Sequence, residues 1–446
     1  MTMLKSIPLR EVATFKYGKT IRKQDISANG LYPVFSGYQI VGFDSKYAFE
    51  EPQLVIVCRG AGGTGDIKMS PEKCSITNLA IVINCDKEII DQDYLYWVLK
   101  LSDTYSLRTG SAQPQITIGS LENFIIEIIE DINTQKKISK ILSGLDNKIH
   151  LNNQINQTLE SIAQAIFKSW FIDFDPVRAK IAAKLEGADP ELAAMCAISG
   201  KSEVELEQMA KDDFAELQAT AALFPDELVE SELGDVPKGW EVGCVGDIAT
   251  AKGGYAFKGS QFVEKGYPVI KIKNITGDGK VDIQGTQCIE EKIARTAAKF
   301  MLHDCDLVMA MTGATVGKTG LVNTHGKSIY LNQRVAKFES EKFGGKISYF
   351  LFCLFNRKEY FEQIVGTAQG SAQPNISSSG IESTSIIVPN FELINLFIKN
   401  TDSIFQYWLK NGSTNNFLNQ IRDTLLPKLL SGEINVSNFQ GEVAIG

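Results

Sequence analysis

A repeated heptapeptide constrains this chain more than any other feature. Gly-Ser-Ala-Gln-Pro-Gln-Ile at residues 110–116 returns as Gly-Ser-Ala-Gln-Pro-Asn-Ile at residues 370–376, with six of seven residues identical. Other matched pairs follow in the same order: Val12-Ala13 with Ile248-Ala249, Tyr32-Pro33-Val34 with Tyr267-Pro268-Val269, Asn78 with Asn332, and Tyr94 with Tyr349. The offset grows from about 235 to about 260, as expected where loops differ in length. Self-similarity on this scale predicts two similar units in one chain.

Each unit has the pattern of short strands and turns followed by a long helix. Apolar or alternating segments at 54–58 and 76–83 in the first unit, and at 269–272 and 307–311 in the second, predict strands. We therefore expect an α+β fold in which both units mix helices and strands.

The helical stretch after each strand-rich part has apolar positions that step by three and four. One seven-residue row consists of Ile138, Leu145, Asn152, Leu159 and Ile166, and it returns as Phe397, Ile404, Asn411, Leu418 and Leu425. A companion row consists of residues 141, 148, 155 and 162, and of residues 400, 407, 414 and 421. Sustained heptads favour two long helices packed as an antiparallel coiled coil, whose asparagines fix the register. The alternative is that each helix packs only on its own domain.

The net charge of −8 is unevenly distributed. Residues 185–234 contain two basic and 13 acidic residues, so the rest of the chain carries about +3. This alanine-rich acidic segment reads as an insertion, with a possible helix at 203–224. A phosphate-binding surface needs only a local cluster of Lys and Arg, so the overall charge does not exclude DNA.

Composition excludes several classes of protein. No apolar run approaches the roughly 18 residues of a membrane span, and residues 1–12 do not resemble a secretory signal. We expect a soluble cytoplasmic protein. The eight cysteines never occur as C-x-x-C and there are three histidines, so we expect no metal site and reduced thiols.

Two glycine loops imitate nucleotide-binding motifs. Residues 60–65 fit G-x-G-x-x-G, and residues 313–319 resemble a P-loop with three residues instead of four between the glycines. Neither is followed by a helical pattern, so both are interpreted as turns between strands. No Asn-Pro-Pro-Tyr-like tetrad or Ser/His/Asp set is present, and Asp66-Ile67-Lys68 and Asp278-Gly279-Lys280 lack a carboxylate partner and read as turns. We expect no catalytic residues.

Basic residues near aromatic ones form the candidate DNA-binding set. In the first unit they cluster around Tyr17, and in the second they flank Tyr255 and Phe257. The candidates are Lys16, Lys19, Arg22, Lys23, Arg59, Lys68 and Arg108 in the first unit, and Lys252, Lys258, Lys271, Lys273, Lys318, Lys327 and Arg334 in the second.

Gln113 and Gln373 of the repeated heptapeptide are further candidates, because glutamine can pair with adenine through two hydrogen bonds. A residue identical in both units cannot by itself distinguish two half-sites. We therefore expect these residues to serve loop architecture or phosphate contact, and base reading to fall to side chains that differ between the units.

The chain resembles the specificity subunits of type I restriction-modification systems over nearly its full length. The resemblance rests on the paired heptapeptide, Met311-Thr312-Gly313 with Gly317-Lys318 ahead of Asn332-Gln333-Arg334, and residues 168–178, 223–226, 234–240 and 425–432. The first unit lacks the Gly-Trp pair found at Gly239-Trp240.

This resemblance implies two target-recognition domains, each reading half of a split DNA site, separated by helices. The implied boundaries are 1–130 and 234–390 for the recognition domains, 131–180 and 391–435 for the helical spacers, 181–233 for the acidic insertion, and 436–446 for a tail. It also implies two modification subunits that use S-adenosylmethionine and a restriction subunit that uses ATP and Mg²⁺, with no cofactor in this chain.

Two other functions are also compatible with the sequence. One is a nucleotide-dependent enzyme that uses residues 313–319, which tight ATP binding would favour. The other is a coiled-coil scaffold without DNA affinity, which salt-dependent binding to a defined duplex would exclude.

Overall fold

The computed structural model describes residues 4–60, 63–110, 113–368 and 374–436, and the chain forms two compact units. Unit 1 consists of residues 1–151 together with 415–446, and unit 2 of residues 152–414. Each long helix contributes to both units, so unit 1 is built from two separate stretches of sequence and unit 2 from one.

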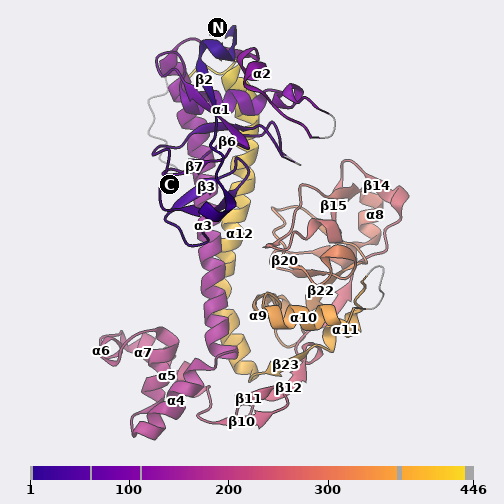
Figure 1. The fold of residues 1–446 in the computed structure, drawn as a ribbon. Coiled ribbons are helices and arrows are strands. Elements are labelled where there is room, and N and C mark those ends of the chain that lie inside the picture. Colours follow the sequence, from indigo (N-terminus) through magenta and orange to yellow (C-terminus); the bar gives the residue numbers. More distant parts are fainter. Residues whose placement is uncertain (1–3, 61–62, 111–112, 369–373, 437–446) are drawn as a thin grey trace. The chain divides into compact units, whose positions relative to one another are not determined.

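Unit 1 contains nine strands and two short helices among its described residues, besides its parts of the long helices (Figure 1). They are β1 (Leu4–Pro8), β2 (Ala13–Tyr17), β3 (Tyr32–Phe35), β4 (Ile40–Asp44), β5 (Leu54–Val57), β6 (Ile67–Met69), β7 (Ser75–Ile76), β8 (Ala80–Cys85), α1 (Gln92–Leu101), α2 (Ile118–Glu122) and β9 (Ile125–Ile129). The strand predicted at 54–58 is β5, whereas the one predicted at 76–83 is divided by a turn into β7 and β8.

Unit 2 has a larger set of elements. Its strands are β10 (Leu228–Ser231), β11 (Gly234–Pro237), β12 (Glu241–Cys244), β13 (Thr250–Gly253), β14 (Phe262–Val263), β15 (Tyr267–Ile270), β16 (Gly279–Lys280), β17 (Gln287–Ile289), β18 (Met301–Leu302), β19 (Leu307–Ala310), β20 (Thr319–Leu321), β21 (Ile329–Leu331), β22 (Val335–Glu339) and β23 (Ser385–Val388). Its shorter helices are α4 (Asp175–Glu186), α5 (Pro190–Ser199), α6 (Glu203–Glu207), α7 (Lys211–Ala222), α8 (Glu291–Thr296), α9 (Ile347–Phe355), α10 (Lys358–Gly366) and α11 (Ser378–Glu382).

The two units repeat the same strand order. The sheet β2-β8-β5-β6 of unit 1 corresponds to β13-β22-β19-β20 of unit 2, where β16 adds a fifth strand. Strand β3 pairs in parallel with β7, as β15 does with β21, and the antiparallel pair β1-β9 corresponds to β12-β23. The predicted duplication is confirmed at the level of topology.

Local details refine the matched pairs. Tyr94 and Tyr349 are each the third residue of their helices and are both buried. The match of Asn78 with Asn332 is wrong by one residue. Thr77 pairs with Lys19 and Asn332 pairs with Tyr255 as single parallel bridges, so Asn78 corresponds to Gln333. The sequence comparison aligned Asn78 with Asn332 because both residues are asparagine.

The long helices are α3 (Ile132–Phe171) and α12 (Phe391–Leu430), each of 40 residues (Figure 1). Asp131 begins α3 by accepting hydrogen bonds from the backbone and hydroxyl of Thr134, which lower its pKa. In both helices the predicted main row is buried or half-buried. The companion row is wrong by one residue, because the buried positions are 142, 156, 163 and 170 in α3 and 401, 408, 415 and 429 in α12.

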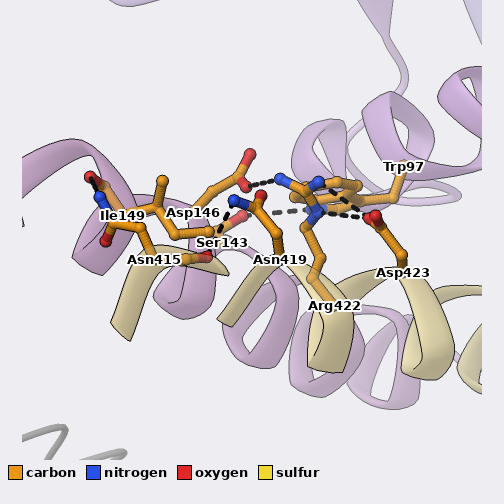
Figure 2. A network of polar contacts seen from close by, with 8 residues as sticks. All are labelled: Trp97, Ser143, Asp146, Ile149, Asn415, Asn419, Arg422 and Asp423. Atoms are coloured by element: carbon orange, nitrogen blue, oxygen red, sulfur yellow. Dashed lines mark hydrogen bonds and ion pairs between the residues drawn. The ribbon is translucent and has the colours of Figure 1, made fainter. Parts of the chain in front are cut away.

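Within each unit the long helices run in opposite directions. In unit 1, Asp146 contacts Arg422 and the carbonyl of Ile149 accepts a hydrogen bond from Asn415 (Figure 2). In unit 2, Asn156 donates to the carbonyl of Trp408 at 3.1 Å, and Phe167 packs on Phe397. In each unit, residues with higher numbers in α3 contact residues with lower numbers in α12, so the two helices are antiparallel.

The polar positions of the main row are also buried. Asn411 donates from Nδ2 to Oδ1 of Asn156 at 3.0 Å, so its partner is a residue that the sequence did not single out. Asn152 is 3% exposed. Buried amides of this kind require partners, because an unpaired one costs about 1–3 kcal/mol.

The acidic insertion folds as short helices. The helix predicted at 203–224 is divided into α6 and α7, because Lys211-Asp212-Asp213 supplies the acidic first turn of a new helix. Ala194, Met195, Leu206 and Ala221 form a small core. Lys180 is buried and donates to Glu191 and to the carbonyl of Phe224, which holds the insertion on α4.

The core of unit 2 is rich in aromatic residues. Phe167, Trp170 and Phe171 of α3 pack against Phe397, with ring centroids 5.6 to 6.4 Å apart.

Among helices of the described residues, none combines the length and apolar composition that a bilayer span requires.

Candidate nucleic-acid interface

Three segments of unit 1 converge at the end of strand β5. The backbone N–H of Cys58 donates to the carbonyl of Leu79 at 2.8 Å, which joins β5 to the turn between β7 and β8. The N–H of Ile116 donates to the carbonyl of Cys58 at 3.0 Å, which adds the end of the first heptapeptide. Arg59 and Gln115 face each other as an antiparallel bridge. These bonds fix the positions from which the nearby side chains project.

Unit 2 has the same convergence with different residues. The N–H of Met311 donates to the carbonyl of Arg334 at 3.0 Å, and that of Ile376 to the carbonyl of Met311 at 2.8 Å. Thr312 and Asn375 form the antiparallel bridge. The positions of Arg59, Leu79 and Gln115 are therefore occupied by Thr312, Arg334 and Asn375.

A fourth segment approaches each turn from the end of the first sheet strand. Asn78 donates its N–H to the carbonyl of Lys19 at 3.0 Å, and Gln333 donates to the carbonyl of Tyr255 at 2.9 Å. A Cβ atom on Gly18 or Gly254 would lie 2.1 Å from a backbone oxygen, so only glycine fits where the segments meet. We call this convergence the loop junction of each unit.

Each glycine loop leads from the loop junction back into its sheet. Gly65 donates its N–H to Val57 at 2.8 Å and Gly317 donates to Ala310 at 2.9 Å, so both loops return to antiparallel strands. The interpretation of residues 60–65 and 313–319 as links between strands is confirmed for their described residues. The two Asp-x-Lys segments are only partly turns, because Asp66 and Asp278 precede the strands β6 (Ile67–Met69) and β16 (Gly279–Lys280), which contain the other two residues of each segment.

The loop junction of unit 2 encloses a groove of about 430 Å³. It is lined by Met311, Thr312, Gln333, Arg334, Pro374 and Asn375. The hydroxyl of Thr312 is buried and has no hydrogen-bond partner within the described structure. Gln333, Arg334 and Asn375 are exposed, so their polar groups can pair with a ligand.

The loop junction of unit 1 carries aromatic and basic groups. The guanidinium of Arg59 lies 5.5 Å from the ring centre of Tyr17, and the carbonyl of Arg59 accepts a hydrogen bond from the Tyr38 hydroxyl at 2.9 Å. Asn78 is half-buried and donates to the hydroxyl of Thr20 at 3.2 Å. The loop junction of unit 1 therefore carries an exposed cation and a half-buried amide.

The structure separates the predicted basic residues of unit 1 into groups. Lys16 and Lys19 are exposed and form no ion pair within the described residues, whereas Arg22 pairs with Asp25 at 2.9 Å. Arg108 stacks on Tyr105 and donates to the carbonyl of Thr64, next to the glycine loop. Lys68 lies on β6. The pKa of Lys100 is lowered mainly by the burial of Lys100, and next by repulsion from the charge of Lys68. The side chain of Lys23 lies outside the described residues.

Unit 2 shows a similar division. Lys252 is paired with Glu339 at 2.6 Å and is not a free cation. The ammonium of Lys271 lies over the ring of Phe262 and donates a hydrogen bond to the side chain of Gln287. The pKa of Lys271 is lowered mainly by its burial and next by repulsion from Lys273. The side chains of Lys273, Lys318 and Arg334 form no ion pair within the described ranges. Lys258 and Lys327 are exposed.

Gln113 is exposed beside the loop junction of unit 1, and Gln373 lies outside the described residues. The sequence missed Asn78, Leu79, Gln115, Thr312, Gln333 and Asn375 as site residues. One signal was available: Gln115 and Asn375 occupy the only position at which the two heptapeptides differ.

Groups of three or more His, Cys, Asp or Glu able to hold a metal ion are absent from the described residues. The cysteines are free thiols, and burial raises the pKa of Cys58 and Cys353.

These observations define a chain with two homologous mixed α/β domains, each carrying the same loop junction. The type I restriction modification DNA specificity domain matches residues 3–161 and 237–421. The HindI specificity subunit of Haemophilus influenzae is 35% identical over 375 residues, which cover 79% of this chain and 80% of that protein. The MjaVIII specificity subunit of Methanocaldococcus jannaschii is 23% identical over 436 residues, covering 93% and 89%.

A solved structure supports the same fold. The S subunit of a type I restriction-modification system from M. genitalium has a TM-score of 0.61 at 16% identity, with 96% of each chain covered. The chain belongs to the family of type I restriction-modification specificity subunits.

Proposed function

We propose that this chain is the non-catalytic subunit that reads DNA in a type I restriction-modification complex. Each recognition domain contacts one half of a split site, and the chain directs adenine methylation and restriction by its partner subunits to that site.

The duplicated loop junction is the observation that carries this proposal. Two copies of one backbone arrangement present different polar side chains, Arg59 and Asn78 in one unit and Arg334 and Gln333 in the other. A single chain that reads two unlike half-sites needs such an arrangement: a common scaffold for phosphate contact and distinct groups for base edges.

The proposed phosphate contacts are the cations around each loop junction that have no acidic partner among the described residues. Lys16 and Lys19 serve the first domain, and Lys258, Lys273 and Lys318 serve the second. Such contacts make binding strongly dependent on salt. The cations held in ion pairs, Arg22 and Lys252, contribute less because DNA must first displace a carboxylate.

We further propose that α3 and α12 form an antiparallel coiled coil that separates the recognition domains and docks two modification subunits. A helix of 40 residues is about 60 Å long, which exceeds one turn of duplex. The partner subunits supply S-adenosylmethionine for methylation, and a restriction subunit supplies ATP-dependent, Mg²⁺-dependent cleavage. The buried row at Ile138, Leu145, Phe397 and Leu418 supports this packing.

The decisive test maps methylated adenines across a genome that encodes the modification subunits, with and without this chain. We expect a split motif of two short specific parts that appears only when the chain is present. Methylation independent of the chain would contradict the proposal. Tight ATP binding by the purified chain, or no salt-dependent affinity for the mapped duplex, would favour the enzyme and scaffold alternatives.

The docking role has its own test. Leu145→Asp and Leu159→Asp place a charge in the helical row, and we expect loss of assembly with the modification subunits. Ile162→Asp is the matched control on α3, because Ile162 is 43% exposed. Unchanged assembly and methylation in the Leu145→Asp and Leu159→Asp variants would remove the helical docking model of partner recruitment.

A further inference from the structure

The two loop junctions share their backbone but differ in chemistry at four equivalent positions. Hydrogen bonding matches Arg59 with Thr312, Asn78 with Gln333, Leu79 with Arg334, and Gln115 with Asn375. Three neighbouring positions are alike, since Gly18 matches Gly254, Pro114 matches Pro374 and Ile116 matches Ile376. The two junctions therefore present different side chains on the same backbone arrangement.

We propose that these four positions determine which bases each domain prefers, Arg59, Asn78, Leu79 and Gln115 for one half-site and Thr312, Gln333, Arg334 and Asn375 for the other. This inference rests on the proposed function. It assigns the specificity of each half-site to the loop junction, whereas the free lysines contact phosphates.

The chemistry of the side chains gives the expected bases. The guanidinium fork of arginine pairs with O6 and N7 of guanine, and the amides of asparagine and glutamine pair with N6 and N7 of adenine. Arg334 therefore predicts a guanine in the half-site of unit 2, beside an adenine contacted by Gln333 or Asn375. Arg59 predicts a guanine in the half-site of unit 1, beside an adenine contacted by Asn78 or Gln115.

The local geometry suits this role better than it suits packing. Gln333, Arg334 and Asn375 are exposed along the groove of unit 2, and none of the three side chains has a hydrogen-bond partner in the described structure. The buried Thr312 hydroxyl, which also lines this groove, has no hydrogen-bond partner among the described residues either. A base edge would supply partners to groups that the protein leaves unsatisfied.

The test exchanges equivalent residues between the units. Arg334→Leu gives unit 2 the residue of unit 1, and methylation motifs are mapped by sequencing with the modification subunits present. We expect the preference at one base pair of the unit 2 half-site to fall roughly tenfold or more, while the unit 1 half-site is unchanged. Leu79→Arg should change preference only in the unit 1 half-site.

Arg295→Leu is the matched control, because Arg295 is an exposed arginine of the same unit that is paired with Glu291 at 2.6 Å. It should leave both half-sites unchanged. An unchanged motif in Arg334→Leu, or an equal loss of affinity for every sequence, would overturn the inference, since the latter is the signature of a phosphate contact.

A second variant keeps the inference testable if Arg334→Leu abolishes methylation. Arg334→Lys retains the charge but not the planar fork, so we expect methylation at a relaxed motif. The full original motif in Arg334→Lys would also overturn the inference. Absence of any split motif with the unaltered chain would instead contradict the proposed function, so the two failures are distinct.

Discussion

The recognition domains of the two units share a backbone and differ in what they add to it. Both contain the same four-strand order, and both end their central strand in a loop junction. Unit 2 adds β16 to this sheet, and β14 and β18 to its second sheet, in which β17 takes the place of β4. Additions at sheet edges leave the junction intact, so duplicated domains can diverge in size while they keep the geometry of their binding loops.

The helical contacts of the two units also differ in chemistry. In unit 1, Arg422 bridges Asp146 of α3 and Asp423 of its own helix, and Trp97 bonds Ser143 (Figure 2). In unit 2, buried amides and aromatic rings take this place. In unit 1 a partly exposed ionic network joins the two helices, whereas in unit 2 buried amides and aromatic rings join them.

The largest expected effect compares the equivalent positions Phe397 and Ile138, both fully buried. We expect Phe397→Ala to cost about 3–5 kcal/mol and Ile138→Ala about 2–5 kcal/mol, each in its own unit. Hydrogen exchange resolved by segment measures the free energy of opening in each unit. Tyr407→Ala is the control, because Tyr407 is 48% exposed on the same helix. Equal loss in that control would show that core burial is not the cause.

The next comparison concerns the amide contacts of unit 2. Asn156→Ala removes the partner of Asn411 and a donor to the carbonyl of Trp408, which should cost about 1–3 kcal/mol. The double variant Asn156→Leu with Asn411→Leu should recover most of this, because no unpaired amide remains. Urea unfolding monitored by circular dichroism provides the values. A double variant less stable than the single one would contradict the argument.

Breaking the ionic network of unit 1 should lower the free energy of unfolding less than removing the buried amide contacts of unit 2. We expect Arg422→Met to cost about 0.5–1.5 kcal/mol, and the cost to shrink as salt rises, because the pair is partly open to solvent. Unfolding at low and high ionic strength gives the comparison. The same salt dependence in Asn156→Ala would indicate that the two contacts do not differ in kind.

The smallest effect concerns Lys16 and Lys252, which occupy equivalent strand positions. We expect Lys16→Ala to weaken duplex binding and to reduce the salt slope by about one, because Lys16 has no acidic partner among the described residues. Lys252→Ala should change binding less, because its ammonium is already paired with Glu339. Titration of the mapped duplex at several salt concentrations is the measurement, and equal slopes would remove the distinction.

Much of the architecture followed from patterns in the sequence. The heptapeptide repeat indicated the duplication, and the steps of three and four indicated helices that became α3 and α12. The absence of a helix after Gly65 and Gly317 was also correctly inferred, because glycine loops between two apolar segments favour a return to the sheet.

The site was predicted less well. Charge identified Arg59 and Arg334, but it also selected Arg22 and Lys252, whose partners Asp25 and Glu339 the sequence could not reveal. Ion pairs depend on which strands are neighbours, and that depends on the fold.

What the sequence determined by itself was periodicity and repetition, since both are carried by the order of residues. Only the tertiary structure decided the register. Ile141 and Leu142 are both apolar, and helix contacts chose Leu142 as the buried one. Asn78 and Asn332 look alike, and sheet pairing matched Asn78 with Gln333 instead. The physical reason is that burial and hydrogen bonding act between segments distant in sequence, so neighbours in space select among positions that the local pattern leaves equivalent.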